Sequence, residues 1–250
     1  MSAPTLPPVE LTLRAEDGVL LKGELQYPAR APDQPFPLAV LAHQWPSTRA
    51  SFGPLVEDLL AAGVAVVTFD HRGHGASTKG PKGRVLIETP HDFTFPSVVL
   101  AFTASARQAG FSHIPNDILR VANWAVLQNF VDGSRVALVG ASVGGSAILA
   151  AAPSMPGLRA AATLGAAGAQ SFGDDGPKRV RTALERLRVP VFLTSSSGDV
   201  FDAATNARNW SKGLGHVRTR IVEGDAHAMA IYYEVRKELV GFLTEALGGR

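Results

Sequence analysis

The sequence predicts an α/β fold in which helices cover both faces of a mostly parallel β-sheet. Short, continuously apolar stretches alternate with segments of helical periodicity, as buried parallel strands and their crossover helices require. A hairpin pattern precedes them. The chain has 250 residues, of which 46% are hydrophobic and 18% are charged. Because this suffices for one large core, we expect 1–250 to form a single domain, with a loose, proline-rich N-terminus at 1–8.

The first two strands are expected to form an antiparallel hairpin. Residues 9–13 and 19–27 alternate between apolar and polar side chains, and Asp17-Gly18 between them is typical of a turn. The apolar runs that follow have the length of strands buried on both faces. They span 38–42, 64–69, 135–139, 159–164, 189–194 and 218–222.

The helices are expected between these strands, over 52–62, 117–130, 146–152, 177–187 and 232–247. Gly63 ends the first of them, and Asn116 and Asp117 are expected to cap the second. The long connection at 77–115 is expected to contain a further short helix at about 96–109. That helix is either an ordinary sheet-covering helix or part of a wall over a functional site.

Composition excludes several classes of function. The chain has no cysteine, so disulfides, a thiolate nucleophile and cysteine-based zinc sites are excluded. The net charge is +2 and the densest basic segment, at 178–188, has the spacing of a solvated helix face, so no nucleic-acid partner is expected. We see neither a membrane span nor a signal peptide. We expect a cytoplasmic location, although a chain whose signal peptide has been removed would look the same.

The strongest motif is Gly140-Ala141-Ser142-Val143-Gly144. It follows an apolar strand and precedes an apolar helix, and this strand–turn–helix setting exposes a nucleophilic serine. The glycines fit because the residues two before and two after the serine crowd each other. An ordinary glycine-rich turn is the alternative; a phosphate loop would need a following Lys-Ser or Lys-Thr. Ser142 is therefore the candidate nucleophile, and the Val143 N–H is a candidate oxyanion donor.

His227 is the candidate general base. It lies between the last strand and the last helix, at the sheet edge where ligands bind in open α/β folds; the alternative is a histidine that caps the helix. The acid is expected on the loop after strand 189–194, where Asp199 is favoured over Asp202. It would fix the imidazole tautomer and stabilise the imidazolium. The other aspartate is expected to cap a helix.

The second oxyanion donor is expected in the loop after the first buried strand. The Trp45 N–H is the first candidate and Gln44 the second, whereas His43 is expected to have a structural role. An apolar pocket is expected from aromatic side chains. These are Trp45, Phe201 and Phe93 or Phe95.

Taken together, these residues resemble the α/β-hydrolase superfamily from about residue 9 to 248. Four motifs occur in the family's order: His43-Gln44-Trp45, 70–75 (Asp-His-Arg-Gly-His-Gly), the serine turn and the His227 loop. The resemblance implies the α/β-hydrolase fold, and it implies that the 70–75 turn is structural. The segment 165–176 is too short for a large cap domain. Two departures are Gln44, where the family usually has glycine, and Ala141, where an aromatic residue or histidine is common.

The members that the chain resembles most are small serine esterases and dienelactone-hydrolase-like or serine-aminopeptidase-like hydrolases. We therefore expect cleavage of a small-molecule carboxylic ester through Ser142, His227 and Asp199, with an acyl-enzyme intermediate and no metal or cofactor. A thioesterase, amidase, peptidase or perhydrolase on the same triad is an alternative. So is a non-catalytic ligand-binding protein, because a fold does not fix a function.

Overall fold

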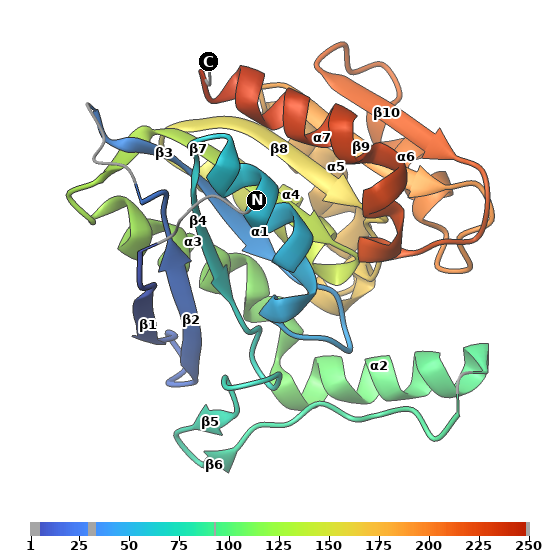
Figure 1. The fold of residues 1–250 in the computed structure, drawn as a ribbon. Coiled ribbons are helices and arrows are strands. Elements are labelled where there is room, and N and C mark those ends of the chain that lie inside the picture. The colour runs from blue at the N-terminus through green and yellow to red at the C-terminus, as the bar shows by residue number, and fades with distance from the viewer. Residues whose placement is uncertain (1–5, 30–33, 93, 249–250) are drawn as a thin grey trace.

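The computed structural model describes residues 6–29, 34–92 and 94–248. Within these ranges ten strands form one sheet, in the order β10-β9-β8-β7-β3-β4-β2-β5-β6, with β1 paired to β2 (Figure 1). All neighbours from β10 to β4 are parallel. These strands are β3 (Phe36–Ala42), β4 (Ala65–Phe69), β7 (Val131–Ala141), β8 (Leu158–Leu164), β9 (Val191–Ser196) and β10 (Val217–Val222). The predicted parallel sheet is confirmed.

The N-terminal hairpin is also confirmed. Strands β1 (Val9–Arg14) and β2 (Leu20–Gln26) pair antiparallel, and β2 continues antiparallel onto β4. Gly18 in their turn has φ +89°, a conformation that glycine adopts without strain. Two short strands, β5 (Lys79–Gly80) and β6 (Gly83–Arg84), extend the sheet and were not predicted. The N-terminus predicted to be loose falls largely outside the described residues, which begin at residue 6.

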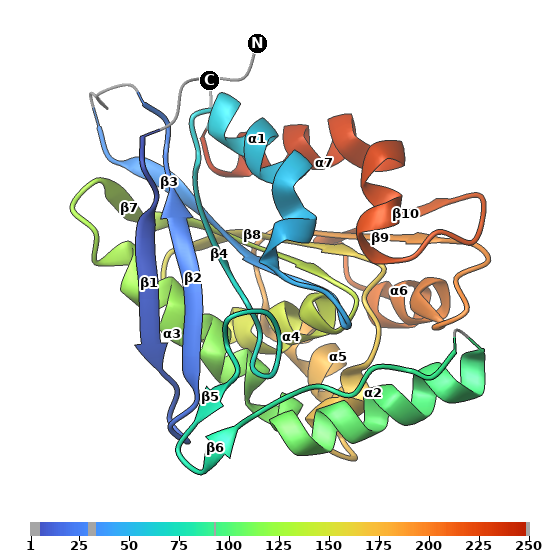
Figure 2. The same cartoon turned by 60° about the horizontal axis from the view of Figure 1, so that its bottom comes forward.

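Helices cover both faces of the sheet, as predicted. Helices α1 and α7 lie on one face, and α3, α4, α5 and α6 lie on the other (Figures 1 and 2). Strand β3 shows why its sequence is continuously apolar: Leu38 and Val40 enter the core beneath α3 and α4, whereas Ala39 and Leu41 enter the core beneath α1 and α7. Among the described helices, none is both long and apolar enough to span a bilayer.

The helix bounds agree with the predictions to within a few residues, except at α3. The α-helices are α1 (Gly53–Ala61), α2 (Phe95–Ala109), α3 (Ile114–Val126), α4 (Val143–Ala151), α5 (Gly176–Arg186), α6 (Ala203–Ser211) and α7 (Tyr232–Ala246). The short 3-10 helices are η1 (Arg49–Phe52), η2 (Phe111–His113), η3 (Ala152–Ser154), η4 (Ala169–Phe172) and η5 (Ala228–Ile231). Only η4 separates β8 from α5, so the fold has no large cap there. Helix α6 was not predicted.

The predicted cap of α3 is wrong. The helix begins at Ile114, so Asp117 lies inside its first turn and makes no capping hydrogen bond. Its carboxylate instead accepts hydrogen bonds of 2.7 and 3.0 Å from the buried guanidinium of Arg72. The helix also ends at Val126 instead of near Phe130, because Phe130 packs on Tyr27 and its carbonyl accepts the Phe36 N–H. The start of α3 therefore follows the proline in its first turn, Pro115, whereas a long-range contact accompanies its end.

Candidate active site

Ser142 stands on a sharp turn between β7 and α4. Its backbone has φ 49° and ψ −120°, and it is one of three non-glycine residues with positive φ in the described chain. A Cβ at Gly140 would overlap the Gly144 carbonyl, and a Cβ at Gly144 would overlap the Ala42 carbonyl. The predicted strand–turn–helix is therefore present, and both glycines are required by close backbone contacts.

Ser142, His227 and Asp199 form one hydrogen-bonded chain. His227 Nε2 lies 2.8 Å from Ser142 Oγ, and His227 Nδ1 lies 2.6 Å from Asp199 Oδ2. The Asp199 side chain is fully buried, and its other oxygen accepts the Phe201 N–H at 2.9 Å. With Asp199 ionised, Nδ1 carries the imidazole proton and Nε2 is free to accept the serine proton. The structure thus brings together three residues that lie 28 and 85 positions apart in the sequence.

The two alternatives for the histidine and the acid differ from this arrangement. His227 stands at the N-terminus of η5, but its side chain makes no capping hydrogen bond. Asp202 stands at the N-terminus of α6, and it too makes no capping hydrogen bond. The prediction that Asp202 caps a helix is wrong in this respect. A capping aspartate has extended backbone, whereas Asp202 is left-handed at φ 59° and ψ 21°.

The two candidate oxyanion donors lie on adjoining segments. Val143 is the first residue of α4, and Gly144 beside it lies close to the backbone of Ala42 and His43, two residues before Trp45. In the described part of the chain, neither the Val143 nor the Trp45 N–H donates a hydrogen bond to a protein acceptor. Both N–H groups are therefore available to a ligand.

The loop after β3 is held in place on both sides. The Trp45 indole donates a 3.1 Å hydrogen bond to Ser105 of α2 and packs on Phe102. The Gln44 carbonyl accepts a 2.8 Å hydrogen bond from His43 Nδ1, and the Gln44 side-chain oxygen lies 3.4 Å from the Ser51 hydroxyl. The glutamine that departs from the family pattern is thus directed toward η1.

Three buried histidines support this loop. His43 Nε2 accepts the backbone N–H of His71 at 2.9 Å, and the His43 ring lies 4.3 and 4.9 Å from the rings of His71 and His74. Burial lowers the pKa of His71 to about 3 and that of His74 to about 4. It also holds the pKa of His43 well below 6.5. The three rings are therefore neutral at pH 7, which agrees with a structural role for His43.

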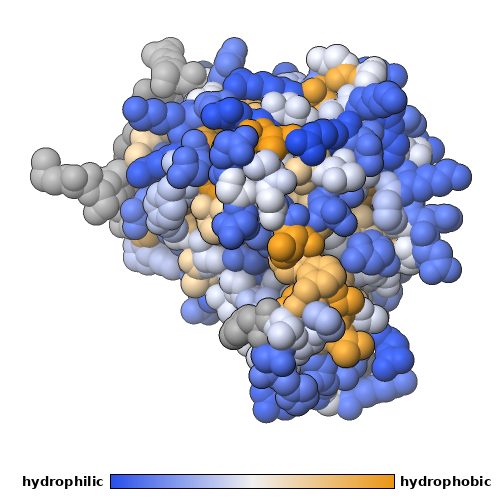
Figure 3. All heavy atoms as spheres, turned by 90° about the vertical axis from the view of Figure 1, so that its right-hand side faces the viewer, coloured by the Kyte–Doolittle hydropathy of each residue, from blue (hydrophilic) through white to orange (hydrophobic). Residues whose placement is uncertain are grey.

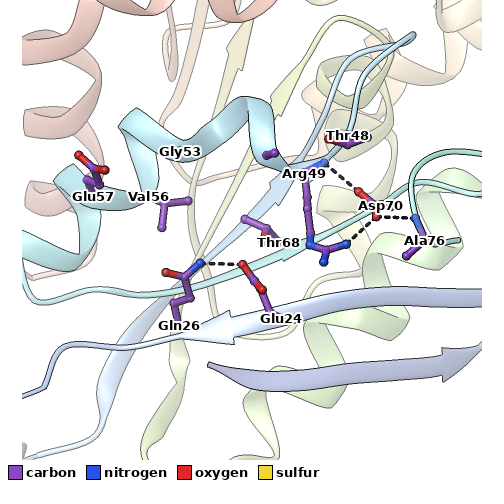
Figure 4. Close-up of a pocket in the computed structure, with 11 residues that line it drawn as sticks. Glu24, Gln26, Thr48, Arg49, Gly53, Val56, Glu57, Thr68, Asp70 and Ala76 are labelled. Carbon is purple, nitrogen blue, oxygen red and sulfur yellow. Dashed lines mark hydrogen bonds and ion pairs between the residues drawn. The ribbon is translucent and has the colours of Figure 1, made fainter. Parts of the chain in front are cut away.

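The turn that follows β4 is built around Asp70. Its carboxylate accepts hydrogen bonds from the backbone N–H groups of Arg49 and Ala76, both at 2.9 Å, and forms an ion pair of 2.5 Å with the Arg49 guanidinium (Figure 4). Two residues further on, Arg72 pairs with Asp17 and Asp117. Burial disfavours the charge of Arg72, but these two carboxylates outweigh that effect and raise its pKa. The turn is thereby tied to η1, to the turn between β1 and β2, and to α3.

An apolar pocket of about 460 Å³ opens at Ser142 and His227. Two of the aromatic side chains predicted to line it, Trp45 and Phe201, do so, and so does Phe95; Phe93 lies outside the described residues. Four further residues of the wall lie on α2 and were not predicted individually. They are Val98, Val99, Phe102 and Thr103. Their spacing of three and four is the signal that could have found them, and it shows that α2 forms a wall of the pocket.

A second cavity, of about 600 Å³, lies between α1 and strands β2 and β4. We call it the polar cavity, because Glu24, Arg49, Thr68 and Asp70 are among the residues that line it (Figure 4). None of the three residues of the hydrogen-bonded chain lines it. The candidate active site is therefore the apolar pocket, which Ser142 and His227 line.

Comparison with known proteins agrees with this architecture. The sequence profile of the alpha/beta hydrolase family matches residues 36–240. The chain belongs to the alpha/beta hydrolase family. Among curated proteins, the chain is 32% identical over 117 residues to an uncharacterized 31.7 kDa protein from the traX-finO intergenic region of Escherichia coli. That match covers 46% of the chain and 32% of the relative, so the chain spans about a third of the length of this relative.

Several solved structures share the fold of this hydrolase. An S-formylglutathione hydrolase from Agrobacterium tumefaciens superposes with a TM-score of 0.67 and 15% identity, over 98% of this chain and 99% of that one. An acetyl xylan esterase from Paenibacillus sp. R4 gives 0.64 and 16%, over 93% and 82%. A dienelactone hydrolase from Anabaena variabilis gives 0.62 and 18%, over 96% and 97%. At these identities the likeness concerns the fold alone.

Proposed function

We propose that this alpha/beta hydrolase is a serine hydrolase that cleaves carboxylic esters. The hydrogen-bonded chain from Ser142 Oγ through His227 to the buried carboxylate of Asp199, with links of 2.8 and 2.6 Å, carries the proposal. A nucleophile, a base and a group that orients the base are the parts that acyl transfer needs. A non-catalytic ligand-binding protein would have no need for this arrangement.

The first half of the reaction acylates the serine. Ser142 Oγ attacks the ester carbonyl carbon while His227 Nε2 accepts the hydroxyl proton. The N–H groups of Val143 and Trp45 donate to the oxygen that becomes negatively charged. The imidazolium of His227 then donates its proton to the leaving alcohol, and the carbonyl re-forms as an acyl-enzyme.

The second half returns the free enzyme. A water molecule attacks the acyl carbon while His227 accepts one of its protons, and the same proton then goes to Ser142 Oγ as the acid leaves. Asp199 stays ionised throughout and stabilises the imidazolium. His227 makes every proton transfer in this reaction. The other groups that the reaction uses are protein side chains, backbone N–H groups and one water molecule.

The choice of an ester rests on the pocket and on the solved relatives. The pocket wall beside Ser142 is mainly apolar, which suits an uncharged acyl or aryl group. Solved structures with this fold include a protein described as an acetyl xylan esterase, whereas the S-formylglutathione hydrolase is named for a thioester. The same triad also serves thioesters and amides, so relative rates on matched ester, thioester and amide substrates decide the leaving group.

The test compares wild type with Ser142→Ala on p-nitrophenyl esters from acetate to decanoate. Removing the nucleophile is expected to lower kcat by about a millionfold. Ser154→Ala is the matched control, because Ser154 is exposed in η3, beyond the far end of α4. If Ser142→Ala folds and keeps its rate, Ser142 is not the nucleophile and the proposal is wrong. If wild type cleaves only thioesters or amides, the triad stands and the ester assignment is wrong.

A further inference from the structure

Asp202 has a carboxylate that the fold does not use. Asp202 stands where a helix-capping aspartate normally accepts backbone N–H groups, but its left-handed backbone, at φ 59°, leaves it without a capping bond. No side-chain hydrogen bond or ion pair joins the Asp202 carboxylate to another described residue. Aspartate is one of the few non-glycine residues that adopt this conformation readily, and Asp202 is exposed to solvent. The carboxylate is therefore free to meet a ligand.

This carboxylate lines the apolar pocket beside the candidate triad. Asp202 shares the wall with Ser142, His227 and the aromatic rings of Phe95 and Phe201, whose centroids are 6.0 Å apart. Among the described residues that line the pocket, none is a lysine or an arginine. Asp202 is thus the only carboxylate in the described wall. The wall offers an anion no cationic lysine or arginine, only neutral donors such as Thr103, Gln170 and Asn206.

The surface at the mouth of the pocket is apolar as well. Phe95, Val99 and Val200 line the pocket and are 53%, 40% and 62% exposed. Figure 3, which views this side of the molecule, shows hydrophobic surface gathered above the polar lower tip. A bound apolar group would cover these side chains, whereas a substrate carboxylate would lose its water here without gaining a cationic partner.

We propose that Asp202 determines the charge of the substrate. The pocket accepts apolar esters that are neutral or carry a positive charge, and it rejects apolar esters that carry a carboxylate. A cationic substrate group is attracted by the Asp202 carboxylate and by the faces of the aromatic rings. An anionic group is repelled by the carboxylate and finds no partner among the rings. This inference rests on the proposed ester hydrolysis and adds the substrate class to it.

The test uses p-nitrophenyl esters of three phenylacetic acids that differ only in the substituent at ring position 4. The substituent is tert-butyl in the neutral ester, trimethylammonio in the cationic ester and carboxylate in the anionic ester. Asp202→Asn is the variant, because asparagine removes the charge and tolerates left-handed backbone. Glu245→Gln is the matched control, because it also converts a carboxylate to an amide. Glu245 is exposed in the last turn of α7, at the end of that helix away from His227.

Wild type is expected to prefer the cationic to the anionic ester by about thirtyfold or more in kcat/KM. Asp202→Asn is expected to lower this ratio about tenfold and to leave the tert-butyl ester within about twofold of wild type. Glu245→Gln should change neither quantity. Raising the salt concentration to about 0.5 M should reduce the ratio for wild type more than for Asp202→Asn, because only wild type has the charge to be screened.

The outcomes separate the inference from the proposed function. If wild type hydrolyses the neutral ester but Asp202→Asn leaves the charge ratio unchanged, the inference is wrong and the ester hydrolase stands. A loss of activity toward the neutral ester in folded Asp202→Asn would also overturn it, since Asp202 would then support the triad. If wild type hydrolyses none of the esters, the proposed function is wrong. In that case the preference for charge is measured by binding. The ligands are three methyl ketones in which a methyl group replaces the p-nitrophenoxy group of each ester, and equal dissociation constants overturn the inference.

Discussion

The apolar pocket and the polar cavity each adjoin a buried aspartate, and the difference between the two aspartates shows what makes a cavity a candidate site. Asp199 pairs with His227, whose second ring nitrogen reaches the hydroxyl of Ser142 in the pocket. Asp70 pairs with Arg49 and with backbone N–H groups, and this network includes no nucleophile. The first carboxylate holds an imidazole beside a hydroxyl, whereas the second fixes a turn. The residues at each cavity, and not its size, therefore identify the pocket as the candidate site.

The origin of the polar cavity explains its composition. Glu24, Gln26 and Thr68 project from β2 and β4 toward α1 (Figure 4). Side chains on β2 alternate between buried and partly exposed, as on a sheet face that water reaches. The cavity therefore follows from incomplete helix cover near the antiparallel edge, and no strained residue lines it. If this distinction holds, substitutions at the apolar pocket should impair catalysis, and substitutions around Asp70 should impair stability.

The strongest effect is expected on catalysis, from Asp199→Asn. Asparagine keeps the shape, but its amide holds His227 in the wrong tautomer, so kcat on a p-nitrophenyl ester should fall about ten-thousandfold. This corresponds to about 5 kcal/mol in the activation free energy. Circular dichroism should show an unchanged fold. A folded variant with wild-type kcat would show that Asp199 does not orient the base.

The next effect is on stability, from the buried histidines near the Asp70 turn. Because the pKa values of His43, His71 and His74 lie below 6.5 in the folded chain, the unfolded chain binds more protons below that pH. Stability is therefore complete above about pH 6.5 and falls as the pH decreases. Between about pH 7.5 and 5.5 the three rings together should cost about 4 kcal/mol.

Urea unfolding at the two pH values measures this loss, and His71→Phe should reduce it by about one third. Neither ring nitrogen of His71 has a hydrogen-bond partner, so the variant removes a titrating group without breaking a bond. The exposed His91 provides the control His91→Asn, which should leave the pH dependence unchanged. An identical pH dependence in His71→Phe would mean that His71 is not held neutral.

Asp70→Asn should have a smaller effect, again on stability. It removes the ion pair with Arg49, and the free energy of unfolding should fall by about 2 kcal/mol. This is less than for a fully buried pair, because the Arg49 side chain is 30% exposed. Urea unfolding measures the loss, and kcat of the folded variant should stay within about twofold of wild type. A catalytic defect like that of Asp199→Asn would erase the distinction between the two regions.

The mildest effect concerns the pocket wall. Val99→Ser removes apolar contact with a long acyl chain and should lower kcat/KM for the decanoate about fivefold, with little change for the acetate. Leu127→Ser is the control, because Leu127 is 82% exposed at the far end of α3. Equal losses for both chain lengths would indicate that Val99 supports the fold and not the substrate.

Much of the fold and of the candidate site could be predicted because local patterns encode it. Apolar runs indicated the parallel strands, and the turn at Asp17-Gly18 indicated the hairpin. Gly140 and Gly144 marked the serine turn, since a Cβ at either would overlap backbone. Chain order then pointed to His227. The start of α3 was misjudged because Asp117 has the composition of a cap but is buried against Arg72.

Local patterns in the chain were sufficient for the α/β architecture and for the candidate triad, because strand periodicity, glycine spacing and order along the chain can be read without knowing any long-range contact. The packed fold was needed to show which aspartate faces His227, which side of α2 lines the pocket and that the Asp202 carboxylate lines it too. These features depend on contacts such as the one between Arg72 and Asp117, 45 residues apart. Such contacts are fixed only when the whole sheet and its helices pack, because each residue's neighbours are then set by the other elements.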